Sequence, residues 1–472
     1  MIGHPQIELA KWKALTGTIL LGVFLGGFCA LGAAQSAAPK EFISFEEAQP
    51  SLQAMSNTLP AELKAQNPLD ADRWSGWVRA QDRAIRARLD RGTEDTLTNL
   101  LRFGVTFTKE YRISDEYLVR YGQSSLVDAF AENRANDLIK AMAAPNAAER
   151  MTEMRAFLEK RGLSLKTSRQ RARVKKYLLD NLARMRDEFL KYRAQAKDEH
   201  RFQLFQDRGI SLDTNLWPDY QLDLHFRNMV EKGLLSLGSV HRVAIVGPGL
   251  DFANKEAGSD FYPPQTTQPF AVLDSLVRLG IADISTVEIY TLDISQEVNL
   301  HIEQARKRAA LDRPYIVQLA WNAARPMSEE YRKNFTDYWQ QLGNRTGSAV
   351  AAIPVPSGVD ALRTRAVKFP AKTTLQITPL DINIVYQRLV LPSTQAFDLV
   401  IGTNIFVYYG EFEQSLARAN IAAMLKPGGF LISNDKLPDA VPSGLNDVLD
   451  TSVVSSTEPL VRDVVFCYQR AK

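Results

Sequence analysis

The spacing of apolar residues changes near residue 240 and divides the chain into two regions. Upstream, apolar side chains recur every three or four residues, the period of a helix with one buried face. The clearest stripes lie at 74–89, 126–139 and 168–197. Gln81 and Asp82 interrupt the first stripe in its middle turn, and Gly92 is expected to end that helix. We therefore predict an all-α domain over 38–235.

Downstream, short apolar runs alternate with helical patterns. Continuous apolar runs suit strands that are buried on both faces of a parallel sheet. Strands are expected at 242–249, 287–293, 374–379, 397–401 and 430–432, with helices at 269–279 and from Ser295 onward. Tyr315 and its neighbours form an extra strand or helix, and 331–342 has a helical pattern. This alternation predicts the α/β class.

The stretch 397–435 is the most informative part of the chain. It contains an apolar strand, a polar loop, a helix, the sequence Lys-Pro-Gly-Gly at 426–429, which is expected to end that helix, and a second apolar strand. Two strands joined by a helix form a parallel crossover, and ligands of such sheets bind at the carboxyl ends of the strands. Thr403, Asn404 and the pair Tyr408 and Tyr409 fall at that end.

This stretch resembles the fourth to fifth strands of class I S-adenosylmethionine-dependent methyltransferases. The residues at 404–409 are most similar to the chemotaxis-receptor type. The resemblance implies a Rossmann-like seven-stranded methyltransferase sheet over 236–472, preceded by the all-α domain. It also implies S-adenosylmethionine as cofactor, and an antiparallel closing hairpin that 451–454 and 461–468 can supply.

The glycine loop after the first strand is a candidate cofactor contact. Gly247 and Gly249 flank a proline, and glycine lets the backbone approach a nucleotide closely. A simple turn needs the same residues, so both interpretations stay open. The family pattern has an acidic residue two positions before the first glycine and a third glycine two positions after the second. This chain has Ile245 and Asp251 there.

Four further residues match cofactor-site positions of the family. Asp293 ends the second strand, where a carboxylate accepts hydrogen bonds from both ribose hydroxyls; the alternative is a helix cap. Asp381 stands where the third strand presents a carboxylate to the adenine amino group. Thr403 and Asn404 match the loop that lines the methyl-transfer channel. The candidate cofactor-binding set is therefore Gly247, Gly249, Asp251, Asp293, Asp381, Thr403 and Asn404, with no catalytic residue assigned.

Two insertions depart from the family plan. The first, near 252–268, is either a rigid lid over the site or an inert surface loop. The second, near 300–372, has the position of the subdomain with which chemotaxis-receptor enzymes engage protein substrates. The stretch 216–230 precedes the sheet, where methyltransferases often carry an element that covers the cofactor.

Composition excludes several other classes. The formal net charge of +3 over 472 residues gives no indication of nucleic acid binding. The five histidines are scattered without ligand spacing, so no metal site is predicted. Cys29 and Cys467 are the two cysteines, and Cys467 lies in an apolar strand pattern that favours packing. Neither a nucleophile elbow nor a phosphate-binding lysine motif occurs.

The amino terminus has the pattern of a targeting segment. After Lys11 and Lys13, residues 14–34 carry no charge, and small residues follow where a signal peptidase can cut. The prediction for 1–37 is a signal peptide or a membrane anchor, hence an exported or membrane-tethered protein. A true start at Met55 would instead leave the protein in the cytoplasm.

These observations lead to two functional hypotheses. The first is an S-adenosylmethionine-dependent methyltransferase acting on an unidentified acceptor, a small molecule or a protein. The alternative is an exported, catalytically inactive methyltransferase-fold protein with a binding or structural role in the cell envelope. The predicted leader and the altered glycine loop support the alternative, because the cofactor is made in the cytosol.

Overall fold

The computed structural model describes residues 38–65, 69–194, 209–252, 260–357, 359, 361–438, 444–457 and 460–472. The predicted signal or anchor segment at 1–37 lies outside the described residues. Within the described ranges, no helix combines the length and apolar character needed to cross a membrane. Pro39–Lys472 forms one compact unit, so the predicted boundary near residue 235 stays a prediction.

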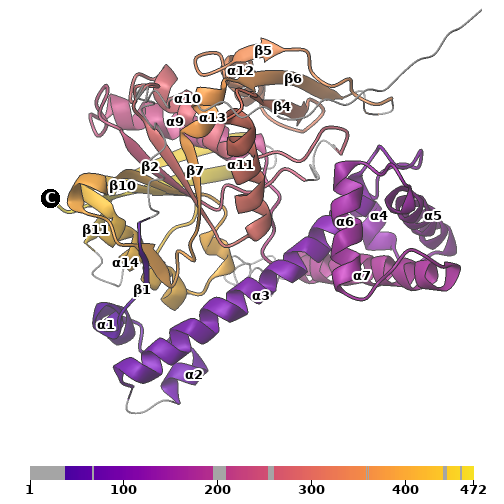
Figure 1. The fold of residues 1–472 in the computed structure, drawn as a ribbon, viewed down its shortest axis with the longest axis horizontal. Helices are drawn as coiled ribbons and strands as arrows, with labels where there is room; N and C mark the ends of the chain where they lie inside the picture. The colour runs from indigo at the N-terminus through magenta and orange to yellow at the C-terminus, as the bar shows by residue number, and fades with distance from the viewer. Residues whose placement is uncertain are drawn as a thin grey trace, which may run out of the picture. The chain divides into compact units, whose positions relative to one another are not determined.

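A seven-stranded sheet forms the centre of the carboxyl-terminal half (Figure 1). Its order is β11-β12-β10-β9-β2-β3-β7. The strands are β2 (Arg242–Val246), β3 (Glu288–Asp293), β7 (Ile377–Asp381), β9 (Phe397–Gly402), β10 (Leu425–Ser433), β11 (Leu445–Thr457) and β12 (Leu460–Arg470). Neighbours from β7 to β10 pair in parallel, whereas β12 runs antiparallel to both β10 and β11. This is the class I methyltransferase sheet with its closing hairpin, so the predicted fold class is confirmed.

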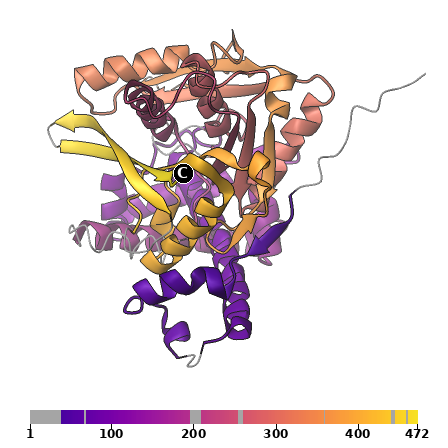
Figure 2. The same cartoon turned by 90° about the vertical axis from the view of Figure 1, so that its left-hand side faces the viewer.

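Helices connect the parallel strands as right-handed α/β crossovers require. They are α10 (Gln268–Arg278), α11 (Gln296–Ala309) and α14 (Glu411–Met424), while α9 (Leu216–Glu231) precedes the sheet. Figure 2 shows the β11–β12 hairpin, drawn in yellow, at the edge of the sheet. The sequence Lys-Pro-Gly-Gly at 426–429 does not form a separate turn, because β10 already begins at Leu425. These four residues belong to β10, and the pairing of β10 with β9 shifts in register between Leu425 and Phe430.

The second predicted insertion contains a small antiparallel sheet. Its order is β4-β6-β5, from β4 (Tyr315–Asn322), β5 (Ser348–Val350) and β6 (Leu362–Phe369), beside α12 (Glu329–Gln341). Of the two predicted possibilities for the stretch at Tyr315, the strand is correct. The short helix α13 (Ala371–Leu375) leads into β7, so the third strand of the main sheet starts three residues later than predicted.

Helices dominate the chain before the sheet. They are α1 (Phe45–Ala54), α2 (Ala61–Lys64), α3 (Ala71–Phe103), α4 (Asp115–Arg120), α5 (Ser125–Ala143), α6 (Glu149–Lys160) and α7 (Ser168–Ala194). The strand β1 (Lys40–Phe42) pairs with β8 (Gln387–Leu389), and short 3-10 turns occupy Ser393–Gln395 and Phe406–Tyr408. Gly92 was predicted to end the first long helix, and that prediction is wrong: α3 continues through it to Phe103 (Figure 1).

Close packing explains why the helix needs glycine at position 92. A Cβ atom there would collide with the backbone carbonyl of Ile210, so the helix and the segment 209–212 touch backbone to backbone. Glycine in a helix interior costs about 1 kcal/mol relative to alanine. Here it permits a contact that no other residue allows. The same contact brings α3 to the carboxyl edge of the large sheet.

Candidate functional site

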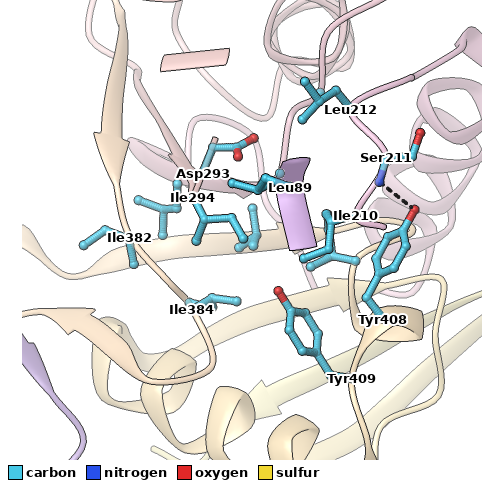
Figure 3. Close-up of a pocket in the computed structure, with 15 residues that line it drawn as sticks. Leu89, Ile210, Ser211, Leu212, Asp293, Ile294, Ile382, Ile384, Tyr408 and Tyr409 are labelled. Carbon is cyan, nitrogen blue, oxygen red and sulfur yellow. Dashed lines mark hydrogen bonds between the residues drawn. The ribbon is translucent and has the colours of Figure 1, made fainter. Parts of the chain in front are cut away.

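A small cavity lies at the carboxyl ends of β2, β3, β7 and β9, where ligands of such sheets bind (Figure 3). Its volume is about 40 Å³. Its lining residues are Leu89, Ile210, Ser211, Leu212, Val246, Gly247, Gly249, Leu292, Asp293, Ile294, Ile382, Ile384, Ile405, Tyr408 and Tyr409. The lining is mainly apolar, and Asp293 contributes its carboxylate. Three of the predicted cofactor contacts, Gly247, Gly249 and Asp293, therefore meet at one cavity.

The glycine loop has the conformation that glycine permits. Gly247 and Gly249 have φ angles of +61° and +72°. The space that their missing side chains leave is occupied by the chain itself. A Cβ atom at Gly247 would collide with Ile405, and one at Gly249 would lie 2.9 Å from the carbonyl oxygen of Leu212.

Asp293 supports the turn before α11 and also lines the cavity, whereas the cap of that helix is Ser295. Its Oδ1 accepts the backbone N–H of Ser295 at 2.7 Å, which holds the turn into α11. Ser295 itself caps that helix, through an Oγ that accepts the N–H of Val298. The Asp293 side chain also lines the cavity and is only 7% exposed. Burial, with a smaller contribution from the nearby Asp381 carboxylate, raises its pKa to about 7.

Asp381 is held by cations from the amino-terminal region. Its Oδ1 accepts from Nη1 of Arg86 at 2.7 Å, and its Oδ2 lies 3.4 Å from Nζ of Lys40. Arg86 belongs to α3, and its Nη1 also donates to the carbonyl oxygen of Ile294 at 3.3 Å. Asp381 ends β7 next to Ile382, which lines the cavity. The edge expected to receive the adenine amino group therefore faces a guanidinium.

Asp251 points away from the cavity into the first insertion. Its Oδ2 accepts from the Tyr262 hydroxyl at 2.6 Å and from Nε2 of Gln265 at 3.2 Å. Burial raises the pKa of Asp251 to about 6. Asp260 of the same insertion accepts the backbone N–H groups of Val105 and Thr106, just beyond α3. In its described part, the insertion joins the glycine loop to the helical region, a role that neither predicted alternative anticipated.

Thr403 and Asn404 lie beside the cavity without lining it. The Thr403 hydroxyl accepts from Nε2 of Gln268 at 2.8 Å. Asn404 has a φ of +59° and exchanges two hydrogen bonds of 2.7 Å with Asn434, from the end of β10. Asparagine is among the few residues that adopt this backbone conformation readily. The loop after β9 then carries Tyr408 and Tyr409 into the cavity wall.

A second buried carboxyl group lies close to this loop. Asp219 of α9 is 2% exposed, and neither of its oxygens makes a hydrogen bond within the described residues, although Gln268 lies near it. Burial raises the pKa of Asp219 to about 8. At neutral pH this group is therefore mostly the uncharged acid.

The upstream part of the cavity wall was not identified from the sequence. Leu89 comes from α3, and Ile210, Ser211 and Leu212 come from the segment before α9 (Figure 3). The one available signal was the polar interruption of the first stripe. Asp82 accepts from Nδ2 of Asn383 at 2.7 Å and from Nε of Arg86 at 3.1 Å, so this interruption marks where α3 meets the sheet edge.

The types of residue around the cavity suit S-adenosylmethionine, but the cavity is too small to hold it. A buried carboxylate ending β3 and a glycine loop after β2 are what a ribose and a methionine carboxylate require. Cavities that hold small molecules usually measure about 300 Å³ or more, against about 40 Å³ here. Within the described ranges, no group of three or more histidine, cysteine, aspartate or glutamate side chains could hold a metal ion.

Comparison with known proteins returned solved structures alone. No protein-family model matches the sequence, and no curated protein does either. Magnesium protoporphyrin IX methyltransferase from Synechocystis PCC 6803 matches at 12% identity, with 60% of this chain and 97% of that chain covered and a TM-score of 0.26. The N-methyltransferase NodS from Bradyrhizobium japonicum WM9 matches at 11% identity, with 53% of this chain and 97% of that chain covered and a TM-score of 0.25. The CurJ carbon methyltransferase matches at 11% identity, with 89% of this chain and 99% of that chain covered and a TM-score of 0.27. The fold assignment therefore rests on the strand order and directions of the sheet.

Proposed function

We propose that this protein is an S-adenosylmethionine-dependent methyltransferase whose cofactor binds at the carboxyl edge of β2, β3 and β9. One observation carries the proposal: on a class I methyltransferase sheet, the positive-φ glycines of the first loop and the carboxylate ending the second strand line the same cavity. The turn into α11 engages Oδ1 of Asp293, through the N–H of Ser295, and the side chain also lines the cavity.

The roles of the chain's own residues follow from their positions. Asp293 would accept the ribose hydroxyls, and the backbone at Gly247 and Gly249 would approach the methionine part. Tyr408 and Tyr409 would exclude water beside the sulfur. The cofactor supplies an already activated methyl group, so orientation and exclusion of water can provide most of the rate acceleration.

The acceptor belongs to one of two classes, a small molecule or a protein. Two features support a protein acceptor: the chemotaxis-receptor likeness of 404–409 and the position of the insertion near 300–372. Nothing in the charge of the chain favours nucleic acid. We also propose export or membrane tethering through 14–34, which a periplasmic reporter fused after residue 60 would test. An active exported reporter would favour the catalytically inactive alternative, because the cofactor is made in the cytosol. An inactive reporter would favour a cytoplasmic enzyme.

Cofactor binding is the decisive experiment. A chain of residues 38–472, which contains the whole compact unit Pro39–Lys472, is titrated with S-adenosylmethionine and S-adenosylhomocysteine by calorimetry. The proposal requires saturable heat with both. The proposal is overturned if folded protein gives no heat with either compound, both in the wild type and in the variants Arg86→Ala and Leu89→Ala. The protein would then have kept the fold without binding the cofactor.

A further inference from the structure

The segments that fill the cofactor position come from the chain itself. We infer that residues 82–89 of α3, together with segment 209–212, form an autoinhibitory plug that must leave the cavity before S-adenosylmethionine can enter. The identity of the excluded ligand rests on the proposed function. The plug itself is a property of the described contacts.

Arg86 closes the side expected to hold adenine. Its guanidinium reaches Asp381, the Ile294 carbonyl and Oε1 of Gln387, at 2.7, 3.3 and 3.4 Å. Asp82, one turn earlier in α3, accepts hydrogen bonds from the side chains of both Arg86 and Asn383. One turn of α3 therefore occupies the hydrogen-bonding groups that follow β3 and β7.

Leu89 fills the apolar part of the site. It lines the cavity, and Figure 3 shows it beside Asp293 and Ile294. Leu89 and the buried Asp293 line the same cavity, and burial beside apolar side chains is unfavourable for the ionised form of a carboxyl group. A ligand that brought two hydroxyl groups to Asp293 would relieve this mismatch.

Segment 209–212 completes the plug on the methionine side. The Leu212 carbonyl accepts the N–H of Leu250 at 2.7 Å, against the glycine loop. The N–H of Ile210 donates to the carbonyl of Arg88 at 3.4 Å, so this segment is tied to α3. Arg88 in turn donates to the carbonyl of Tyr408 at 3.0 Å. Helix and segment thus close the cavity as one piece.

The plug part of α3 lies between two buried ends of the helix, and its polar contacts with the sheet are partly exposed. Trp74 and Trp77, at the start of α3, are buried and pack on Phe412 and Tyr386. By contrast, the ion pairs of Asp381 with Arg86 and Lys40 leave 46% of the Asp381 side chain exposed. Pairs in such positions contribute little net stability. Opening of the plug therefore requires the middle of α3 to give up these partly exposed ion pairs and the buried Ile85, while both ends of the helix stay docked.

The test compares full-length protein with plug variants. Arg86→Ala and Leu89→Ala remove the two plug contacts, and Arg83→Ala is the matched control, because Arg83 is exposed on the same turns of α3. S-adenosylhomocysteine affinity is measured by calorimetry. We expect at least about fivefold tighter binding in each plug variant, the lower end of typical coupling between sites, and no change in Arg83→Ala. Affinities equal to or weaker than wild type would overturn the inference and leave the proposed function standing.

A second readout does not depend on the cofactor. Ile382→Cys places a thiol in the cavity wall, in a chain where Cys29→Ser removes the amino-terminal thiol and Cys467 is buried. Its rate of reaction with a maleimide reports opening. The inference requires slow labelling that Arg86→Ala and Leu89→Ala accelerate and Arg83→Ala does not. Equal rates in all four chains would overturn it, whereas accelerated labelling without any ligand heat would retain the plug and reject the proposed function.

Discussion

Asp293 is the residue on which cofactor affinity should depend most strongly. Its pKa lies near 7 rather than near 3.8, because burial disfavours the charged form. At pH 6 the group is mostly the neutral acid, and at pH 8 it is mostly a carboxylate that can accept from two hydroxyls. S-adenosylhomocysteine should therefore bind about tenfold more tightly at pH 8 than at pH 6.

Calorimetry at pH 6, 7 and 8 measures this change directly. Asp293→Asn keeps the size of the side chain but has no titrating group, so its affinity should be lower at pH 8 and flat with pH. A wild-type profile as flat as that of the variant would mean that the Asp293 carboxylate does not touch the ligand.

Asp219 should limit stability at alkaline pH. Its pKa is about 8 in the folded chain against an ordinary value of 3.8, since burial disfavours the ionised form. Between pH 3.8 and about pH 8, Asp219 is protonated to a greater extent in the folded state than in the unfolded state. Stability from this group is therefore fully present at low pH and decreases as pH rises, by at most about 1.4 kcal/mol per pH unit.

Asp219→Asn removes that loss. Relative to wild type, the free energy of unfolding of the variant should increase steadily from pH 5 to pH 8, as measured by urea denaturation. Asp450→Asn, at an exposed position, controls for the general effect of replacing aspartate by asparagine. A constant difference for Asp219→Asn would place its pKa near the ordinary value.

At the scale of elements, α3 depends on the aromatic cluster at its amino-terminal end. Trp74 is 1% exposed, stacks on Trp77 at 5.3 Å between ring centroids, and donates its Nε1–H to the Ile43 carbonyl at 2.9 Å. Trp74→Ala should lower the free energy of unfolding by about 3–5 kcal/mol. Leu126→Ala, at a position 81% exposed, should change it by less than about 0.5 kcal/mol. Urea denaturation of both variants checks this, and a loss below about 1 kcal/mol for Trp74→Ala would show that the cluster is not an anchor.

The elements that sequence patterns predicted are those whose partners are local or repetitive. Apolar residues dominate β2 and β9, because both faces of these strands are largely buried. Gly92 misled the prediction, since a glycine that ends a helix and one that admits a neighbouring backbone look identical in sequence. The same distinction applies to the residues of the cavity. Asp293 could be predicted from its place at the end of a strand, whereas Leu89 could not, because it reaches the cavity through a contact between segments about 200 residues apart.

At the scale of the whole molecule, one hydrophobic core crosses the predicted domain boundary. It includes Leu97 of α3 and Leu178 of α7 together with Ile245 and Ile401 of the large sheet. The boundary expected near residue 235 therefore falls beside α9, whose aromatic residues pack on α12. Trp217 lies 4.0 Å from Phe335 between ring centroids, and its indole is 7% exposed.

A fragment of residues 236–472 should for this reason fail to fold on its own. Cutting at 235 removes α9 and exposes the face of Phe335 that Trp217 covers, together with the apolar surface under α3. We expect the fragment to lack a cooperative thermal transition and near-ultraviolet circular dichroism, both of which residues 38–472 should show. A fragment of residues 209–472, which keeps α9 but not α3, separates the two contributions: recovery of a transition would assign the loss to α9, and its absence would extend the requirement to α3. A sharp transition in 236–472 itself would instead establish an independent methyltransferase-fold domain and make the shared core dispensable for folding.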